Sequence, residues 1–347
     1  MKIHEKYISR CIALAKNGLG TTYPNPMVGS VIVYEGKIIG EGWHKKAGGP
    51  HAEVNAVNSV KDKSLLKKAT IYVSLEPCSH FGKTPPCCNL IIENEIPNVV
   101  IGTVDPNIMV AGNGIKKLIE AGINVTVGIL EDKCNELNKR FFTFHQKKRP
   151  YIILKWAQSQ DGFIAPLEKT EKKPVWITNT YSRQLVHKWR TEEQAILVGT
   201  QTVIDDNPKL NARDWHGNNP VRIVLDQNNR IPSDYSVFDD QTKTIVFTNS
   251  KNAVSKENTT FEVIDFKQNI AKQIVDSLYR NNIQSVIIEG GLQTLQTFID
   301  ANLWDEARIF IGKPFFGTGI KAPVLPKTNS EEHKIAEDEL KITRNHD

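Results

Sequence analysis

The chain has 347 residues, of which 39% are hydrophobic and 24% charged, the composition of a folded globular protein with room for about two domains. No apolar run approaches the roughly 20 residues that cross a bilayer, so we expect no membrane span. The net charge of +5 is not gathered in a basic tract with interleaved aromatic residues, so we expect no nucleic-acid partner.

The first half of the chain predicts alternating helices and strands. Apolar residues recur at helical spacing from Tyr7 to Ala15, which predicts an amphipathic first helix rather than a signal peptide, and we expect a cytoplasmic location. The next elements are a hairpin of 28–34 and 37–42, a helix at 52–60, a strand at 70–75, a helix at 89–95, a strand at 98–103, a helix near 115–121 and a strand at 124–128.

The pattern changes after residue 131, where a polar helix is followed by a charged stretch that ends at Pro150. We place a boundary there and predict domains 1–148 and 149–347. In the second half we predict strands at 151–157, 195–198, 221–226, 244–248, 261–265, 285–288 and 307–311, and helices at 181–190, 269–281 and 292–301. Both domains are therefore predicted to be α/β. The charged residues 329–347 are predicted to be loosely ordered.

The cysteines indicate metal binding. The five form an odd, sparse set that does not suit a disulfide framework, and three of them fall within eleven residues: Cys11, Cys78, Cys87, Cys88 and Cys134. One imidazole, two thiolates and a water make a tetrahedral catalytic zinc site, and His51, Cys78 and Cys87 could supply the protein ligands. Glu53 would fit the carboxylate that shuttles protons, provided that His51 and Glu53 both lie in a first helical turn.

Plainer interpretations stay open. His-x-Glu is a common pattern, and Pro-Cys alone is weak evidence for a metal site. The paired cysteines could simply be buried residues that pack in the core. A structural zinc site would need a fourth protein ligand, which His44, His80 or Cys88 could supply.

The motifs around these residues resemble the bifunctional deaminase–reductase family of riboflavin biosynthesis. The similarity rests on Asn25-Pro26-Met27-Val28-Gly29, on the run from His51 to Ala56, on the run from Leu75 to Cys87, on Asp105-Pro106-Asn107 and on Val110 to Gly114. Eight residues separate Cys78 from Cys87, an insert typical of this family. The resemblance covers nearly the whole chain and implies a cytidine-deaminase-like first domain and a dihydrofolate-reductase-like second domain.

For the first domain the resemblance implies that Zn²⁺ is held by His51, Cys78 and Cys87, and that Glu53 is the catalytic proton shuttle. It implies substrate contacts from Asn25, Lys83 and Thr84, although Lys83 could equally be an ordinary loop lysine. The implied reaction removes the 2-amino group of a diaminopyrimidinone that carries ribose 5-phosphate. Cys88 lies outside the motif.

For the second domain the resemblance implies reduction of the ribosyl group to ribityl by NADPH. No Gly-x-Gly-x-x-Gly follows a strand, but Glu289-Gly290-Gly291 precedes a helix, where backbone N–H groups could meet a phosphate. The implied NADPH contacts are Ala157, Trp176, Thr202, Asp206, Gln227, Gly291, Leu292, Gln293, Thr294, Leu295, Gln296 and Thr297. The implied substrate contacts are Arg190, Leu210, Arg213 and Glu289. Four places depart from the family pattern: Gln160, Pro174, Asn179 and Gly317-Thr318-Gly319.

Without the resemblance, the residues of the second domain have structural explanations. Arg190 and Arg213 could form surface ion pairs, Trp176 could belong to the core, and Asp206 could cap a helix or turn. The whole protein could also be a deaminase with a non-reducing second domain, a deaminase of free nucleosides or RNA bases, or a non-enzymatic zinc-stabilised protein. Family analogy implies a homo-oligomer.

Overall fold

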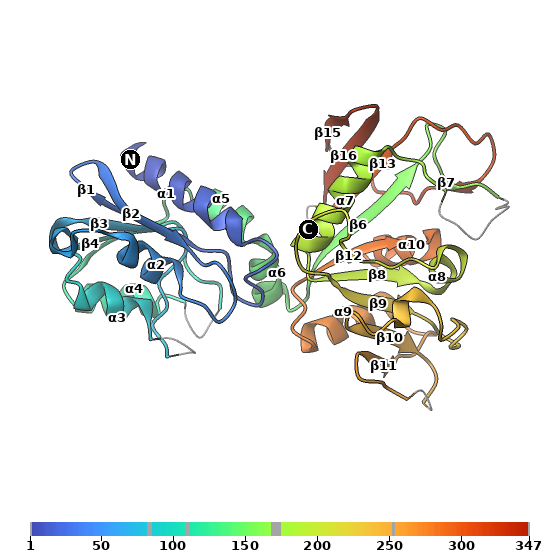
Figure 1. Cartoon of the computed structure of the whole chain (residues 1–347), viewed down its shortest axis with the longest axis horizontal. Helices are drawn as coiled ribbons and strands as arrows, with labels where there is room; N and C mark the ends of the chain where they lie inside the picture. Colours follow the sequence, from blue (N-terminus) through green and yellow to red (C-terminus); the bar gives the residue numbers. More distant parts are fainter. Residues whose placement is uncertain (1, 82–84, 108–110, 168–174, 252–253, 346–347) are drawn as a thin grey trace. The chain divides into compact units, whose positions relative to one another are not determined.

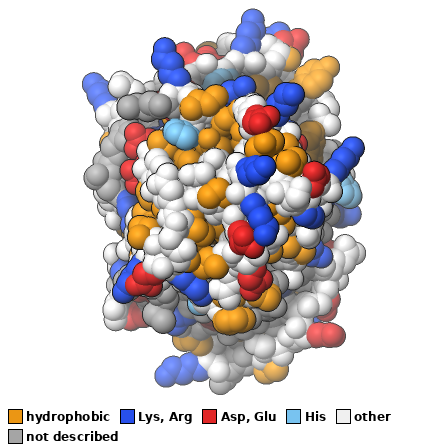
Figure 2. Space-filling view, turned by 90° about the vertical axis from the view of Figure 1, so that its left-hand side faces the viewer, with side chains coloured by type: hydrophobic (Ala, Val, Ile, Leu, Met, Phe, Trp, Pro, Cys, Tyr) orange, Lys and Arg blue, Asp and Glu red, His pale blue; other side chains and the backbone are white. Residues whose placement is uncertain are grey.

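The structure is a computed structural model that describes residues 2–81, 85–107, 111–167, 175–251 and 254–345 (Figure 1). The chain divides into two compact units, Met1–Lys148 and Arg149–Asp347. On the face shown in Figure 2, Lys and Arg side chains are scattered among acidic and apolar ones rather than gathered in one patch. Among the described residues, every helix is too short or too polar to cross a lipid bilayer.

The first unit is a five-stranded sheet with helices on both faces. The strand order is β2-β1-β3-β4-β5, where β1 is antiparallel to both neighbours and the remaining pairs are parallel. The strands are β1 (Gly29–Tyr34), β2 (Lys37–Trp43), β3 (Thr70–Val73), β4 (Asn98–Ile101) and β5 (Asn124–Val127). On one face lie α1 (Lys2–Ala15) and α5 (Glu131–Leu137), and on the other α2 (Ala52–Ser59), α3 (Cys87–Glu93) and α4 (Asn113–Glu120).

The predicted elements of this unit are confirmed to within a few residues. Helix α1 buries Tyr7, Ile8, Cys11, Ile12, Leu14 and Ala15, the apolar set that predicted it. The hairpin turns at Glu35 and Gly36, which both have positive φ (49° and 74°), the conformation that matches the twist of the flanking strands. The unit ends with α6 (Lys139–Lys147), and two short 3₁₀ turns lie at Lys16–Gly18 and Lys63–Lys68.

The second unit is built on a nine-stranded sheet of order β11-β10-β9-β8-β12-β6-β13-β16-β15. Its strands are β6 (Tyr151–Gln158), β8 (Ala195–Gly199), β9 (Val221–Leu225), β10 (Thr244–Thr248), β11 (Thr259–Val263), β12 (Ser285–Gly290), β13 (Glu306–Ile311), β15 (Ser330–Ile335) and β16 (Asp338–Arg344). Helices α9 (Ile270–Arg280) and α10 (Leu292–Asp300) pack on one face, and α7 (Thr180–Glu192) and α8 (Thr200–Asp206) on the other. A small pair, β7 (Phe163–Ala165) and β14 (Ile320–Lys321), and a 3₁₀ turn at Ser236–Phe238 complete it.

The prediction that residues 329–347 are loosely ordered is wrong for their described part. Strands β15 and β16 form an antiparallel hairpin, and β16 extends the sheet antiparallel to β13. The buried side chain of Leu340 joins the core beside Trp189 and Phe310. The buried carboxylate of Asp338 accepts hydrogen bonds from the Asn179 backbone N–H (2.8 Å) and the Ser182 hydroxyl (2.6 Å), which ties the hairpin to α7.

Candidate active sites

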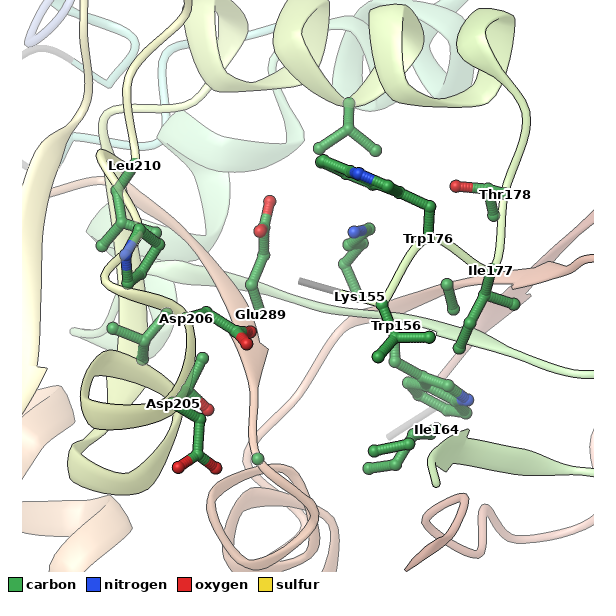
Figure 3. Close-up of a pocket in the computed structure, with 18 of the residues that line it drawn as sticks. Lys155, Trp156, Ile164, Trp176, Ile177, Thr178, Asp205, Asp206, Leu210 and Glu289 are labelled. Carbon is green, nitrogen blue, oxygen red and sulfur yellow. The ribbon is translucent and has the colours of Figure 1, made fainter. Parts of the chain in front are cut away.

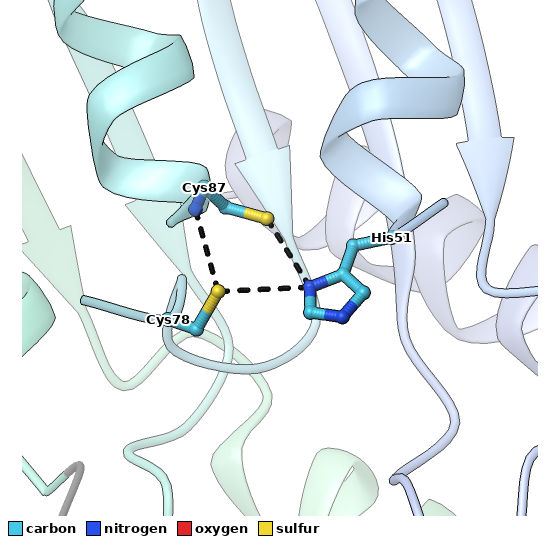
Figure 4. Close-up of side chains that lie close together, drawn as sticks. All are labelled: His51, Cys78 and Cys87. Atoms are coloured by element: carbon cyan, nitrogen blue, oxygen red, sulfur yellow. Dashed lines mark hydrogen bonds between the residues drawn. The ribbon is translucent and has the colours of Figure 1, made fainter. Parts of the chain in front are cut away.

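Three potential metal ligands meet at the ends of α2, α3 and β3 (Figure 4). His51 is the residue before α2, Cys87 is the first residue of α3, and Cys78 lies in the loop after β3. The Nδ1 atom of His51 lies 3.6 Å from the Cys78 sulfur and 3.3 Å from the Cys87 sulfur, and all three ligand atoms fall within 4.8 Å of one another. The structure therefore brings the predicted ligands together, although they are 27 and 36 residues apart in sequence.

The chemistry of this donor set fits Zn²⁺. A hydrogen bond from Cys87 and the neighbouring His51 lower the pKa of the Cys78 thiol to about 4, so the site favours a thiolate, the form that binds metal. Within the described residues, neither His44, His80 nor Cys88 joins the cluster. The Cys88 thiol instead donates to the carbonyls of Pro77 and Gly114. Three protein ligands leave one position for water, which is the pattern of catalytic rather than structural zinc.

Glu53 is buried beside this cluster. It lies in the first turn of α2, as the sequence requires for it to share a pocket with His51. Only 3% of its surface is exposed, and burial together with the charge of Cys78 raises its pKa to about 7. A carboxyl group poised near neutrality is suited to both accepting and donating a proton.

A second buried glutamate, Glu76, holds the loop that carries Cys78. One of its carboxylate oxygens accepts hydrogen bonds from the N–H groups of Asp105 (3.2 Å) and Gly112 (3.0 Å). The other accepts from Gly114 (2.9 Å) and Ile115 (3.3 Å), in the first turn of α4. Glu76 thus neutralises the N-terminal end of α4 and fixes it against the Pro77-Cys78 loop. Glu76 lies within the motif that runs from Leu75 to Cys87, but the sequence alone predicts no role for it.

Of the predicted substrate contacts in the first unit, Asn25 can be placed. Its amide nitrogen lies 3.1 Å from Nε2 of His44, whose other ring nitrogen, Nδ1, lies 3.0 Å from the Pro50 carbonyl. The His44 ring in turn packs edge-on against His51, with centroids 5.3 Å apart. Asn25 therefore lies close to the metal ligands. Lys83 and Thr84 lie outside the described residues.

The second unit contains a cavity of about 1150 Å³ at the carboxyl ends of β6, β8 and β12 (Figure 3). Small-molecule sites commonly enclose about 300–1000 Å³, so this cavity has room for a cofactor and a substrate together. Most of the predicted site residues line it, namely Ala157, Trp176, Arg190, Thr202, Asp206, Leu210, Arg213, Glu289, Gly291, Leu292, Gln293 and Leu295.

Four predicted cofactor contacts are not among the residues that line the cavity: Gln227, Thr294, Gln296 and Thr297. Three of them lie on α10 and have partners within the protein. Thr294 is buried against Gly199. The Gln296 side chain forms hydrogen bonds with Asp300 and Val324, and the Thr297 hydroxyl donates to the Gln293 carbonyl. The first turn of α10 does face the cavity. Gly291 precedes it with φ 52° and no side-chain cap, so the helix presents open backbone N–H groups that suit a cofactor phosphate.

A largely buried charge cluster lines the cavity. The Glu289 carboxylate pairs with the Arg190 guanidinium through contacts of 2.7 and 3.2 Å. Burial alone would raise the pKa of Glu289, but the charges of Arg190 and Lys155 outweigh it and lower that pKa to about 2. Burial in turn lowers the pKa of Lys155. Figure 3 shows Lys155 and Glu289 pointing into the same space between Leu210 and Trp176.

Lys155 is a functional candidate that sequence analysis missed. Its position in the predicted strand 151–157 was clear, but a lysine in a strand gives no sign that the fold will place it beside a glutamate 134 residues later. The available signal was its polarity, since a lysine interrupts a run of buried apolar residues in β6.

Several structural explanations for the second-unit residues are wrong. Arg190 is not a surface ion pair, since its side chain is 11% exposed and its partner Glu289 is buried as well. Trp176 is not core, since 57% of its surface is exposed, and the Arg183 guanidinium stacks on it at 4.6 Å. The Arg213 guanidinium contacts the Asn211 side chain, while Asp214 pairs with His187. Leu210 is buried with φ 53°, a strained conformation of the kind that gathers at functional loops.

The structure explains one departure from the family pattern. The Asn179 side chain caps α7 by accepting a hydrogen bond from the Ser182 N–H (3.0 Å), and its amide donates to the Ile335 carbonyl (2.8 Å). Gln160 uses its backbone N–H to bond Pro314. Pro174 lies outside the described residues.

A zinc-ligand cluster on a deaminase-like sheet and a dinucleotide-sized cavity on a second sheet define a two-domain metal-dependent deaminase and reductase. Comparison with known proteins agrees. Residues 1–103 match the cytidine and deoxycytidylate deaminase zinc-binding region, and residues 150–343 match the RibD C-terminal domain.

Curated and solved relatives extend over nearly the whole chain. The riboflavin biosynthesis protein RibD of Aquifex aeolicus is 42% identical over 95% of this chain and 93% of its own length. A crystal structure of a diaminohydroxyphosphoribosylaminopyrimidine deaminase/5-amino-6-(5-phosphoribosylamino)uracil reductase from Thermotoga maritima has a TM-score of 0.89 at 39% identity, over 99% of both chains. Acinetobacter baumannii RibD gives a TM-score of 0.89 at 32% identity, again over 99% of both chains.

The chain therefore belongs to the RibD family, the bifunctional deaminase–reductases of riboflavin biosynthesis. The predicted α/β fold, with a deaminase-like first domain and a reductase second domain, is confirmed. So is the expectation of a zinc-dependent deaminase joined to an NADPH-dependent reductase.

Proposed function

We propose that the first unit, residues 1–148, deaminates 2,5-diamino-6-(5-phosphoribosylamino)pyrimidin-4(3H)-one, and that the second, residues 149–347, reduces the ribosyl group of the product. The observation that carries the first assignment is the convergence of His51, Cys78 and Cys87 beside a buried carboxyl group. His51, Cys78 and Cys87 would hold Zn²⁺, which when bound activates a water for attack on the amino-bearing ring carbon.

Glu53 moves the protons in this scheme. The activated water attacks C2, which bears the leaving amino group, and Glu53 accepts the proton that the water loses. It passes this proton to the ring nitrogen, then accepts the remaining proton of the added hydroxyl group and delivers it to the amino group, which leaves as ammonia while the hydroxyl oxygen becomes the carbonyl oxygen of the product. Burial keeps bulk water from competing, and the raised pKa of Glu53 makes both transfers accessible near neutral pH. Asn25, whose amide nitrogen lies 3.1 Å from Nε2 of His44, would orient the pyrimidine.

The test is Glu53→Gln in the full chain, since glutamine keeps the size of the side chain and cannot shuttle protons. We expect deamination to fall by at least 10³-fold, with zinc content, unfolding temperature and reduction of the deaminated intermediate unchanged. Glu93→Gln, which makes the same substitution at the exposed last residue of α3 in the same unit, is the control. Retained turnover by Glu53→Gln would contradict the assignment, and loss of zinc would indicate a structural role instead.

In the second unit, Arg190 and Arg213 would grip the ribose phosphate, Glu289 would bond the sugar, and the first turn of α10 would hold cofactor phosphates. NADPH, when bound, supplies a hydride for C1′. For C1′ to accept it, the bond from C1′ to the ring oxygen must break, and that oxygen must gain a proton. Lys155 is the residue proposed to give it, since it lines the cavity next to Glu289 and has a lowered pKa.

Lys155→Met tests this role because methionine keeps the unbranched chain and removes the proton. We expect kcat for NADPH oxidation with the deaminated intermediate to fall by about 10²–10⁴-fold, with deamination unaffected. Lys209→Met, at the rim of the same cavity, serves as the control. Equal loss in the two variants would contradict a specific role for Lys155.

The proposal includes a cytoplasmic homo-oligomer that acts on a small phosphorylated pyrimidine and not on nucleic acid. The scatter of basic side chains on the face in Figure 2 supports the last point. Sedimentation of the zinc-loaded chain tests the oligomeric state. A single species at the monomer mass of 39.1 kDa would contradict the proposed homo-oligomer.

A further inference from the structure

We propose that His187 is a positioning residue of the reductase site, which takes up a proton when a sugar phosphate binds and thereby locks the loop of residues 207–214 against α7. This inference rests on the proposed phosphate grip of Arg190 and Arg213. It assigns a role to a residue that neither the sequence motifs nor the site described above includes.

The geometry places His187 between the two elements that would hold the phosphate. It lies on α7, three residues before Arg190, and both side chains line the cavity. Only 4% of His187 is exposed, and its Nε2 lies 3.1 Å from the Asp214 carboxylate in the loop. Arg190 reaches the same loop by donating to the Asn211 carbonyl (3.1 Å). His187 and Arg190 therefore anchor neighbouring residues of one loop.

One nitrogen of His187 has unused bonding capacity. Among the described residues, its buried Nδ1 has no hydrogen-bond partner, which is a costly state for a polar atom. With Nε2–H donating to Asp214, Nδ1 of the neutral ring carries no proton. A proton on Nδ1 would give the ring a positive charge and make its hydrogen bond to Asp214 charge-assisted, which would hold the loop more firmly against α7.

The surrounding charges explain why this proton is absent before substrate binds. Burial lowers the pKa of His187, and the positive charges of Arg190 on α7 and Arg213 in the loop lower it further. Asp214 and the Asn211 carbonyl act in the opposite direction, and Glu289 on β12 also interacts with His187. A phosphate dianion bound to Arg190 and Arg213 would cancel their effect and shift His187 toward its charged form.

The consequence is a coupling between proton uptake and phosphate binding. Ribose 5-phosphate is a suitable probe because above pH 7.5 its phosphate is already almost fully ionised. In calorimetric titrations of the full zinc-loaded chain at pH 7.5, run in two buffers of different ionisation enthalpy, we expect an uptake of between 0.3 and 1 proton per bound ligand, a range set by roughly how far one histidine can shift. Affinity should fall several-fold between pH 7.5 and 8.5.

His187→Gln keeps a hydrogen-bonding side chain near Asp214 but cannot gain a charge. It should show no proton uptake and a pH-independent affinity, with an unchanged unfolding temperature. His216→Gln, which changes an exposed histidine two residues beyond Asp214, should behave like wild type. Proton uptake retained in His187→Gln would overturn the inference.

Two further outcomes separate this inference from the proposal beneath it. If Arg213→Ala abolishes binding while wild type binds without proton uptake, the phosphate grip stands and the role of His187 is wrong. If Arg213→Ala binds ribose 5-phosphate as tightly as wild type, or wild type does not bind it at all, the grip itself is wrong and the inference falls with it.

Discussion

Replacing Glu76 by glutamine should destabilise the first unit and weaken its hold on zinc. The Glu76 carboxylate accepts four backbone hydrogen bonds, at 2.9 to 3.3 Å, from Asp105, Gly112, Gly114 and Ile115. Glutamine offers one carbonyl oxygen, so two of these buried N–H groups would face an NH₂ group. At about 1 kcal/mol per unsatisfied donor, the free energy of unfolding should fall by about 2 kcal/mol.

The charge adds to this loss. Glu76 neutralises the N-terminal end of α4, an interaction of about 0.3–1 kcal/mol that glutamine cannot replace. A total of about 2–3 kcal/mol in a unit of this size corresponds to a fall in unfolding temperature of roughly 4–12 °C. Because Glu76 fixes the loop that carries Cys78, zinc affinity should fall about 10–100-fold, as expected when support for a metal ligand is removed.

Zinc release provides an assay that reports on the first unit alone. Unfolding in urea, followed by a chromogenic zinc indicator, should show a lower midpoint for Glu76→Gln. Glu95→Gln, whose exposed carboxylate pairs only with Lys67 among the interactions described for it, should leave the midpoint unchanged. A loss below about 0.5 kcal/mol in Glu76→Gln, the range of ordinary surface substitutions, would refute the reasoning.

Three other predictions follow from separate contacts. Removing zinc with a chelator should abolish deamination and spare the reduction of the deaminated intermediate, because the ligands and the reductase cavity lie in different units; parallel loss in both assays would contradict this. Asp338→Asn should lower the free energy of unfolding by about 1–3 kcal/mol, because its buried oxygen serves Asn179 and Ser182, and an unchanged urea midpoint would be inconsistent with that role. Trp176→Ala should raise KM for NADPH several-fold with little change in stability, since the side chain is mostly exposed; a stability loss above about 2 kcal/mol would instead indicate a core residue.

The sequence predicted those features whose pattern lies within a few neighbouring residues. Strands and helices were predictable because their apolar periodicity repeats within a few residues, as in α1. The metal ligands were predictable because each lies beside the start of a helix or the end of a strand, where their motifs mark the boundary. The hairpin of β15 and β16 was missed because β15 is charged and exposed along most of its length, and because β16 joins the sheet through a distant strand, β13.

The roles of Glu76, Lys155 and His187 could not be predicted for a different reason. Each depends on partners brought together by the fold, such as the N–H groups 29 to 39 residues beyond Glu76. No local pattern distinguishes such a residue from an ordinary charged one. On α10 the family motif predicts more contacts than the cavity lining includes. The resemblance implies a continuous run of cofactor contacts from Gly291 to Thr297, but a helix turns only part of its surface toward one cavity.

Three buried glutamates show how environment decides what a carboxyl group can do. Glu76 has its oxygens occupied by four backbone N–H groups and is therefore suited to hold a loop. Glu289 faces Arg190 and Lys155, which lower its pKa to about 2 and keep it a permanent anion that can bind a sugar. Glu53 is buried among thiols and an imidazole, and its pKa rises to about 7. Glu53 can therefore change its protonation state cheaply near neutral pH, whereas Glu289 cannot, which is why the proton transfers of deamination are assigned to Glu53.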